Sequence, residues 1–217
     1  MTPEVIARLD RCSKAYRRGV ETVHALSGVS LTLSPGELVA VAGPSGSGKT
    51  TLLNLLVGWE RPDSGSVDWT GAVVPPPWRT LGVVPQRLGL VEELTVGENG
   101  CLPASLDPSR SLPDGYVDEL LDALRIAHLG DRLPHQVSLG EQQRTAIARA
   151  LVLRPTMVVL DEPTGHQDED SATAVMVTLR RAALDGTCCV VASHAPDLLE
   201  TVDRTVRLAD GRVTARA

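Results

Sequence analysis

Aromatic residues are scarce in this sequence, with three Trp, two Tyr and no Phe among 217 residues. Positive charge is scarce as well, because 21 basic residues stand against 27 acidic ones and give a formal net charge of −6. Proteins that bind nucleic acids combine a basic surface with aromatic side chains on which the bases stack. The composition therefore predicts that nucleic acid is not a partner of this chain.

Long apolar runs are missing too. No stretch reaches the ~18 consecutive apolar residues that a membrane-spanning helix needs, and the first residues contain no apolar signal core. The four cysteines do not have the spacing of a disulfide framework, and Cys188 and Cys189 are neighbours within an apolar strand pattern. We therefore expect a cytoplasmic protein with reduced thiols, and any membrane span in its working complex must come from another chain.

The sequence does contain enough apolar residues for a core, because 42% are hydrophobic and a chain of this length buries roughly 70% of its unfolded surface. Short apolar runs predict strands buried on both faces of a parallel sheet at residues 37–42, 81–84, 156–160 and 187–192. Apolar residues at helical spacing predict helices at residues 50–57, 117–129, 141–153 and 171–184. Two hairpins are also predicted, one from residues 66–69 with the run near Val73 and one around Asp210-Gly211. The pattern predicts an α/β fold with a mainly helical insertion between about residues 90 and 154.

Residues 43–50, Gly-Pro-Ser-Gly-Ser-Gly-Lys-Thr, fit the phosphate-loop pattern G-x-x-x-x-G-K-[ST] without a mismatch, between a predicted strand and a predicted helix. Gly46 and Gly48 allow the backbone amides to point inward, and the helix N-terminus adds partial positive charge. Lys49 is placed to pair with the β- and γ-phosphates of a nucleotide, and the Thr50 hydroxyl to bind Mg²⁺. The chain has only two lysines, which weakens the alternative that a Gly/Ser-rich loop matches by accident.

A pair of acids follows the apolar run at residues 157–160. The carboxyl edge of a parallel sheet is where α/β proteins place their ligand-binding groups. We expect Asp161 to hold Mg²⁺ through water and Glu162 to polarise an attacking water molecule. The alternative is a surface acid pair that caps a strand, which is common alone but not beside a complete phosphate loop.

Residues 138–141, Ser-Leu-Gly-Glu, form an S-x-x-E capping box, which predicts that a helix begins after Ser138 with its amide donors exposed. Gly140 would let the backbone come close to a phosphate there. The segment therefore predicts a second anion site, and the alternative is an ordinary capped helix.

The segment from Val137 to Leu151 resembles the signature of ATP-binding-cassette (ABC) ATPases, and it precedes the Asp161 strand as it does in that family. Residues 23–26, 94–99 and 134–136 are similar to the lipoprotein-release, macrolide-export and cell-division branch. The resemblance covers nearly the entire chain. It implies one ABC ATP-binding domain over residues 1–217, with a P-loop NTPase (RecA-like) core of residues 1–88 and 155–217. It also implies a small N-terminal antiparallel β subdomain and an inserted α-helical subdomain at residues 89–154.

The resemblance implies roles for further residues. Tyr16 resembles the aromatic residue that stacks on adenine, and Gln86 the glutamine that joins the core to the helical insertion. Asp168 resembles the acid of the loop that crosses the dimer, and His194 the histidine that touches the γ-phosphate. The catalytic residues expected are Lys49, Glu162 and His194, and the metal-binding residues expected are Thr50, Gln86 and Asp161. The nucleotide-binding residues expected are Tyr16, Gly43, Pro44, Ser45, Gly46, Ser47, Gly48, Lys49, Thr50, Thr51, Gln86, Ser138, Gly140 and Glu141.

By the same resemblance, the chain is an ATP-hydrolysing subunit that powers a separate transmembrane permease at the cytoplasmic face of the cell membrane. Two copies would close around two ATP molecules, each pocket using Ser138 and Gly140 of the other chain. One alternative is the ATPase of a non-transport, cell-division-like membrane complex. Another is a soluble ABC ATPase of translation or repair, which usually has two cassettes or long insertions. A third is a small-molecule P-loop kinase, which has no use for a second anion site.

Three positions depart from the family pattern. Leu139 stands where the family usually has glycine, Glu141 replaces the commoner glutamine, and Gln167 stands where the family prefers leucine. We expect an active enzyme, in which the isobutyl group of Leu139 slows or loosens closure on the nucleotide of the opposing chain.

Overall fold

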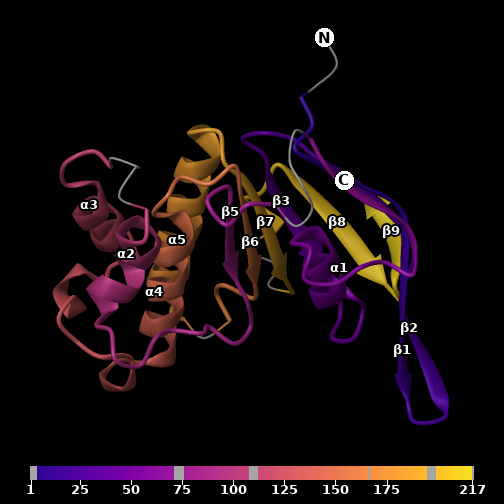
Figure 1. The fold of residues 1–217 in the computed structure, drawn as a ribbon, viewed down its shortest axis with the longest axis horizontal. Helices are drawn as coiled ribbons and strands as arrows, with labels where there is room; N and C mark the ends of the chain where they lie inside the picture. Colours follow the sequence, from indigo (N-terminus) through magenta and orange to yellow (C-terminus); the bar gives the residue numbers. More distant parts are fainter. Residues whose placement is uncertain (1–3, 71–75, 108–111, 166, 195–198, 217) are drawn as a thin grey trace.

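The computed structural model describes residues 4–70, 76–107, 112–165, 167–194 and 199–216. Within these residues the backbone forms a six-stranded sheet, a three-stranded sheet and a group of helices beside the larger sheet (Figure 1). The larger sheet has the strand order β5-β6-β7-β3-β8-β9. Its strands are β3 (Leu38–Ala42), β5 (Leu81–Val84), β6 (Met157–Asp161), β7 (Cys188–Ser193), β8 (Arg204–Ala209) and β9 (Arg212–Arg216). The first five strands of this order are parallel, as the apolar runs predict for β3, β5, β6 and β7.

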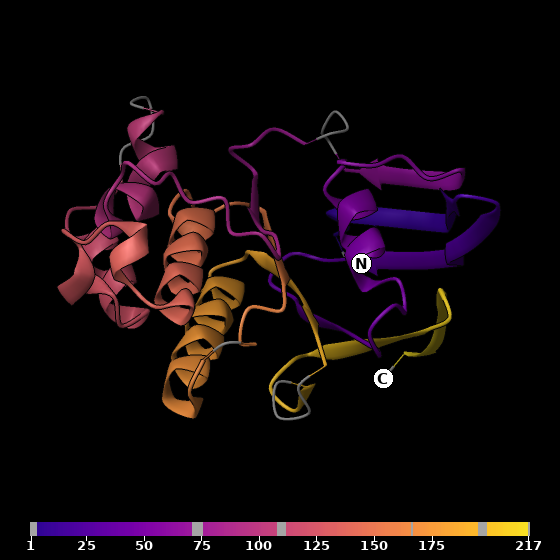
Figure 2. The same ribbon diagram turned by 90° about the horizontal axis from the view of Figure 1, so that it is seen from below.

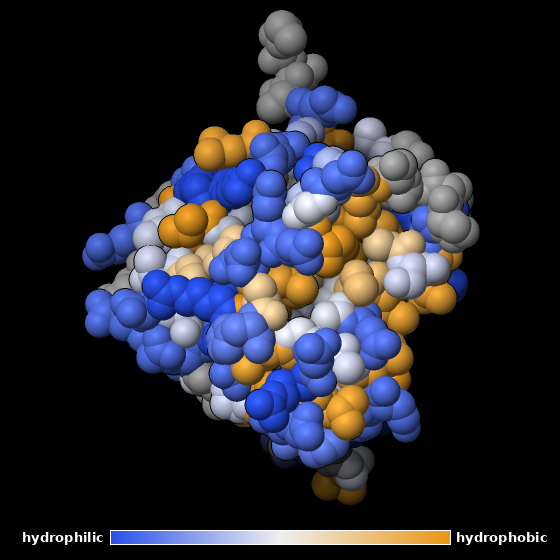
Figure 3. Space-filling view, turned by 90° about the vertical axis from the view of Figure 1, so that its left-hand side faces the viewer, coloured by the Kyte–Doolittle hydropathy of each residue, from blue (hydrophilic) through white to orange (hydrophobic). Residues whose placement is uncertain are grey.

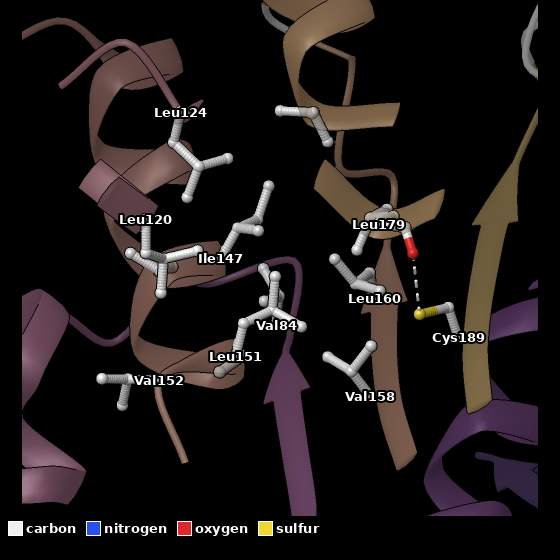
Figure 4. Packing of buried hydrophobic residues seen from close by; sticks show 14 of the residues in the cluster. Val84, Leu120, Leu124, Ile147, Leu151, Val152, Val158, Leu160, Leu179 and Cys189 are labelled. Atoms are coloured by element: carbon white, nitrogen blue, oxygen red, sulfur yellow. Dashed lines mark hydrogen bonds between the residues drawn. The ribbon is translucent and has the colours of Figure 1, made fainter. Parts of the chain in front are cut away.

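Burial on both faces explains why the central strands are apolar throughout. Every residue of β3, β6 and β7 is buried. Successive side chains of a strand point to opposite faces. Leu38 and Ala40 therefore join a core with helices α4 (Leu139–Leu151) and α5 (Glu169–Leu184), part of which is shown in Figure 4. Val39 and Val41 join a second core with helix α1 (Lys49–Leu56).

The smaller sheet is antiparallel, with the order β2-β1-β4. Its strands are β1 (Ala7–Arg18), β2 (Glu21–Leu33) and β4 (Ser64–Trp69). The run near Val73, which we expect to form a hairpin with residues 66–69, lies outside the described residues, and the structure pairs β4 with β1. The second predicted hairpin is confirmed, because β8 and β9 are antiparallel and both Asp210 and Gly211 have positive φ.

The predicted helix over residues 117–129 is wrong beyond its first part. Helix α3 (Tyr116–Ala123) ends before Leu124, Arg125 has a φ of 56°, and the 3₁₀ helix η1 (Ala127–Leu129) follows. Leu124 and Ile126 are both fully buried. Residues two apart on a helix lie on different faces, so the chain leaves the helix here to bury both side chains.

The remaining helices complete one end of the molecule, seen in Figure 2 (α2 Val96–Ser105; η2 Pro134–Gln136). Helix α4 packs closely on the larger sheet. The approach is so close that a Cβ atom on Gly82 of β5 would collide with the Ala150 carbonyl. The division into a core of residues 1–88 and 155–217 and an insertion of residues 89–154 stays a prediction. Within the described residues, no helix combines the length and the apolar character needed to cross a bilayer.

Candidate nucleotide-binding site

The 43–50 loop connects the end of β3 to the start of α1 and depends on its glycines for two reasons. Gly46 and Gly48 have φ values of 79° and 103°, which side chains rarely adopt. A Cβ atom on Gly48 would collide with the Ala25 carbonyl, and one on Gly43 would collide with the Leu208 carbonyl. Strands β2 and β8 thus enclose the loop, and larger residues at these positions would force it out of shape.

The polar groups inside the loop match what a phosphate requires. Lys49 is largely buried, and its Nζ atom donates hydrogen bonds to the carbonyls of Gly43 (2.8 Å) and Pro44 (3.2 Å). The Ser47 hydroxyl is buried and has no hydrogen-bond partner among the described residues. Buried polar groups normally have partners, and the N-terminus of α1 favours an anion. The loop therefore fits a phosphate group.

Two oxygen-bearing side chains meet beside the loop. The Thr50 hydroxyl donates a hydrogen bond of 2.8 Å to Oδ2 of Asp161, the last residue of β6. Burial raises the pKa of the Asp161 carboxyl group. Hydroxyl and carboxylate oxygens are ligands that Mg²⁺ prefers, and Gln86 lines the same small cavity as Thr50 and Asp161. The three predicted metal-binding residues therefore lie together.

Glu162 has an unusual backbone and a direct partner in His194. Nδ1 of His194 lies 2.9 Å from Oε1 of Glu162, and the His194 side chain is otherwise mostly exposed. Glu162 has a φ of 53°, a left-handed conformation that costs a non-glycine residue about 1–3 kcal/mol. Hydrogen bonds hold its peptide on both sides: its N–H donates to the Ala192 carbonyl (2.9 Å), and its carbonyl accepts from Nε2 of Gln143 (2.6 Å). These hydrogen bonds therefore fix the backbone of Glu162, from which its carboxylate side chain extends.

Tyr16 lies at the far end of the loop, on β1. Its hydroxyl donates to Oε2 of Glu60 (2.5 Å) and lies 3.5 Å from Oγ1 of Thr51. Oε1 of Glu60 accepts from Nδ2 of Asn54 on α1 (2.8 Å), and 37% of Tyr16 is exposed. The aromatic ring is therefore held next to α1 with part of its surface open. Sequence reasoning missed Glu60 and Asn54, because neither belongs to a motif with a recognisable spacing.

A family model described as ABC transporter matches residues 26–165, which is more than half of the chain. The chain belongs to the ABC transporter family. It is 39% identical to the lipoprotein-releasing system ATP-binding protein LolD 1 of Rhodopirellula baltica over 215 residues, 94% of each chain. It is 37% identical to the cell division ATP-binding protein FtsE of Bacillus subtilis over 208 residues, 91% of this chain and 90% of that one. A solved dimeric structure of the ATP-binding cassette MJ0796 bound to ADP and Pi has a TM-score of 0.86 at 30% identity, covering 98% of both chains.

These comparisons confirm the expected family, its branch and the P-loop α/β fold class. As a member of the family, the cassette binds and hydrolyses ATP. The roles of the individual site residues stay predictions that rest on the geometry described here.

The signature segment of the cassette forms a second, separate group of predicted site residues. The capping box is confirmed: the Glu141 N–H donates to Oγ of Ser138 (3.3 Å), and the Ser138 N–H donates to Oε2 of Glu141 (2.7 Å). Gly140 is buried in the first turn of α4, and Leu139 is 49% exposed. Among the described residues, the side-chain hydrogen bonds of Ser138 stay within this turn. In the part of the chain that the structure describes, none of these hydrogen bonds joins Ser138 to the phosphate loop of its own chain.

The structure gives Asp168 a local role. Its carboxylate accepts hydrogen bonds of 2.9 Å from both the N–H and the hydroxyl of Ser171, so it caps the N-terminus of α5. These hydrogen bonds hold the pKa of Asp168 below its usual range. Its expected part in crossing a dimer stays a prediction.

Proposed function

We propose that the cassette is the ATP-hydrolysing subunit of a membrane complex, in which two copies close around two ATP molecules and drive a separate transmembrane permease. The observation that carries this proposal is the separation of two complementary groups on one chain. The phosphate loop with Asp161, Glu162 and His194 forms one group, and the capped start of α4 at Ser138 forms the other. A second copy in the opposite orientation would place its Ser138 segment over the loop and complete the pocket.

Each copy would contribute most of the chemistry itself. The amides of the 43–50 loop and Lys49 would bind the β- and γ-phosphates, and Tyr16 would stack on adenine. Thr50, Asp161 and Gln86 would hold Mg²⁺, which would neutralise charge on the transferred phosphoryl group. Glu162 would accept a proton from the attacking water, and its contact with His194 would orient the carboxylate.

The other copy would supply amide donors. Ser138 and Gly140 lie at the start of α4, where the N–H groups of the first turn and the helix dipole favour an anion. Glu141 would support them through the capping box. We propose a homodimer as the simplest assembly, in line with the solved dimeric structure of the MJ0796 cassette.

Removal of the metal tests the chemistry of each pocket. We expect purified cassette to release phosphate from ATP in the presence of Mg²⁺ and to lose at least about 95% of this activity in excess EDTA, because the charge on the phosphoryl group then has no counter-ion. Restored activity after Mg²⁺ is added back in excess is the control. Hydrolysis that continues unchanged in EDTA would contradict the assigned role of Thr50 and Asp161.

Capture from membranes tests the partner. The helices at the left of Figure 1 present a face on which apolar areas lie between hydrophilic residues (Figure 3). We place the cassette at the cytoplasmic face of the cell membrane and expect tagged cassette to retain an integral membrane protein from detergent-solubilised membranes. A permease would support transport. A division protein would support the alternative that the similarity to FtsE raises, and failure to retain any membrane protein would contradict both.

A further inference from the structure

Helix α4 connects the two groups of site residues. It begins after Ser138, which we propose to meet the nucleotide of the other copy. Gln143 lies five residues further along, about 7.5 Å along the helix axis, and is almost completely buried. Its Nε2 atom donates the 2.6 Å hydrogen bond to the carbonyl of Glu162. One rigid helix therefore carries both the predicted contact to the partner copy and a contact to the catalytic carboxylate of its own chain.

A second glutamine sets the orientation of the Gln143 amide. Nε2 of Gln167 lies 3.4 Å from Oε1 of Gln143, so the Gln143 oxygen faces Gln167 and its NH₂ group faces Glu162. Nε2 of Gln167 also donates to the Pro163 carbonyl (2.7 Å), and Oε1 of Gln167 lies 3.3 Å from NH1 of Arg144, which is itself largely buried. Arg144, Gln167, Gln143 and Glu162 thus form one chain of hydrogen bonds. Hydrogen bonds connected in this way polarise and strengthen one another inside a protein.

Glu162 is the last residue of this hydrogen-bonded series, and its backbone conformation has to be stabilised by its neighbours. Glu162 is held in a left-handed backbone conformation, and strained residues keep such conformations only when their surroundings determine them. Apart from Gln143, the Glu162 carbonyl accepts only a longer bond among the described residues, from the Gly165 N–H at 3.3 Å. Gln143 is therefore the principal group that fixes the Glu162 carbonyl, while the Ala192 carbonyl holds the Glu162 N–H.

We infer that Gln143 and Gln167 are positioning residues that hold Glu162 in its catalytic orientation and tie it to the Ser138 end of α4. The inference rests on the proposed function, because it assigns a task to the site that performs hydrolysis. The leucine that the family prefers at position 167 has neither a donor nor an acceptor, so this polar link is a property of the present chain. Gln167 acts on Glu162 through Gln143 and through the Pro163 carbonyl next to it.

Steady-state ATP hydrolysis by purified variants tests the inference. Gln167→Leu is expected to lower kcat about five-fold, within the range that the loss of one hydrogen bond produces, with an unchanged KM for ATP. Gln143→Met is expected to lower kcat at least about ten-fold. The double variant should fall little below Gln143→Met, because residues that act in one network are not additive. A residue that only stabilised the fold would lower the unfolding temperature without this split between kcat and KM.

Thr178→Val is the matched control, because it also removes a buried hydrogen-bonding group, the hydroxyl that donates to Ala174 within α5 (2.8 Å), away from the site. It should keep the wild-type kcat. If Gln167→Leu does not fold, Gln167→Glu keeps the acceptor for Arg144 and loses the donor, and it should lower kcat in the same way. Wild-type kcat in a folded Gln167 variant, or losses that multiply in the double variant, would overturn the inference alone. Failure of the wild-type chain to hydrolyse any ATP would overturn the proposed function as well.

Discussion

Replacement of Lys49 by alanine is expected to abolish ATP hydrolysis, with a loss of at least about 100-fold in kcat. Removal of one preorganised group that stabilises transition-state charge costs about 10²–10³-fold, and the Lys49 ammonium is the cation that the structure places within the phosphate loop. Its Nζ atom donates to the Gly43 and Pro44 carbonyls within the loop, where we expect the phosphates to bind. Phosphate release from Mg-ATP at saturating nucleotide measures the effect. Full activity in Lys49→Ala would contradict the assignment of the loop.

The other lysine of the chain provides the control. Nζ of Lys14 on β1 is bound to the Arg61 carbonyl (2.9 Å) and to Asp63 (3.1 Å), away from the interior of the loop. Lys14→Ala removes the same charge and should leave kcat unchanged. The comparison separates loss of the phosphate contact from a general change in the charge of the protein.

Glu162→Gln is expected to turn the cassette into an ATP-dependent dimer. The amide cannot accept a proton from water, so hydrolysis stops, while its size and its position beside His194 are kept. The bound ATP should then hold two chains together. Light scattering should report the 23.0 kDa monomer without nucleotide and double that mass with Mg-ATP. A dimer that forms equally well without ATP would contradict nucleotide-driven closure.

Leu139 decides how a persistent monomer is interpreted. Its side chain is half exposed in the first turn of α4, where the nucleotide of the opposing copy is expected to lie. If Glu162→Gln binds ATP but stays monomeric, the further change Leu139→Gly should restore the dimer by removing the isobutyl group. A double variant that also stays monomeric would contradict the homodimer and indicate a different partner cassette.

The parts of the fold that follow from short stretches of sequence were predictable. Glycines at positions 46 and 48 carry the positive φ values of the loop, and Ser138 with Glu141 sets the start of α4. The Asp210-Gly211 pair produces the hairpin between β8 and β9. Each of these features depends on residues that lie close together in the sequence, so it can be predicted without knowledge of the tertiary packing.

The helix after Val117 shows where local reasoning fails. Its apolar residues follow helical spacing as far as Leu124, but Ile126 does not, and the core takes up both side chains by breaking the helix at Arg125. The pairing of β4 with β1 joins strands that are far apart in the sequence, so local reasoning does not reach it either. Burial in a shared core thus overrides the periodicity of a short segment.

By itself, the sequence determined which chemistry to expect of this protein: a loop with the phosphate-binding pattern, the acids at the end of β6 and the family to which they belong. Only the tertiary structure decided how these groups are held. The partners of Tyr16 and Glu162, namely Glu60 and Gln143, are 44 and 19 residues away from them along the chain. Sequence motifs contain the groups that contact a ligand. The groups that support them come from elements that are distant in the sequence and pack together only in the fold, so no spacing along the chain reveals them.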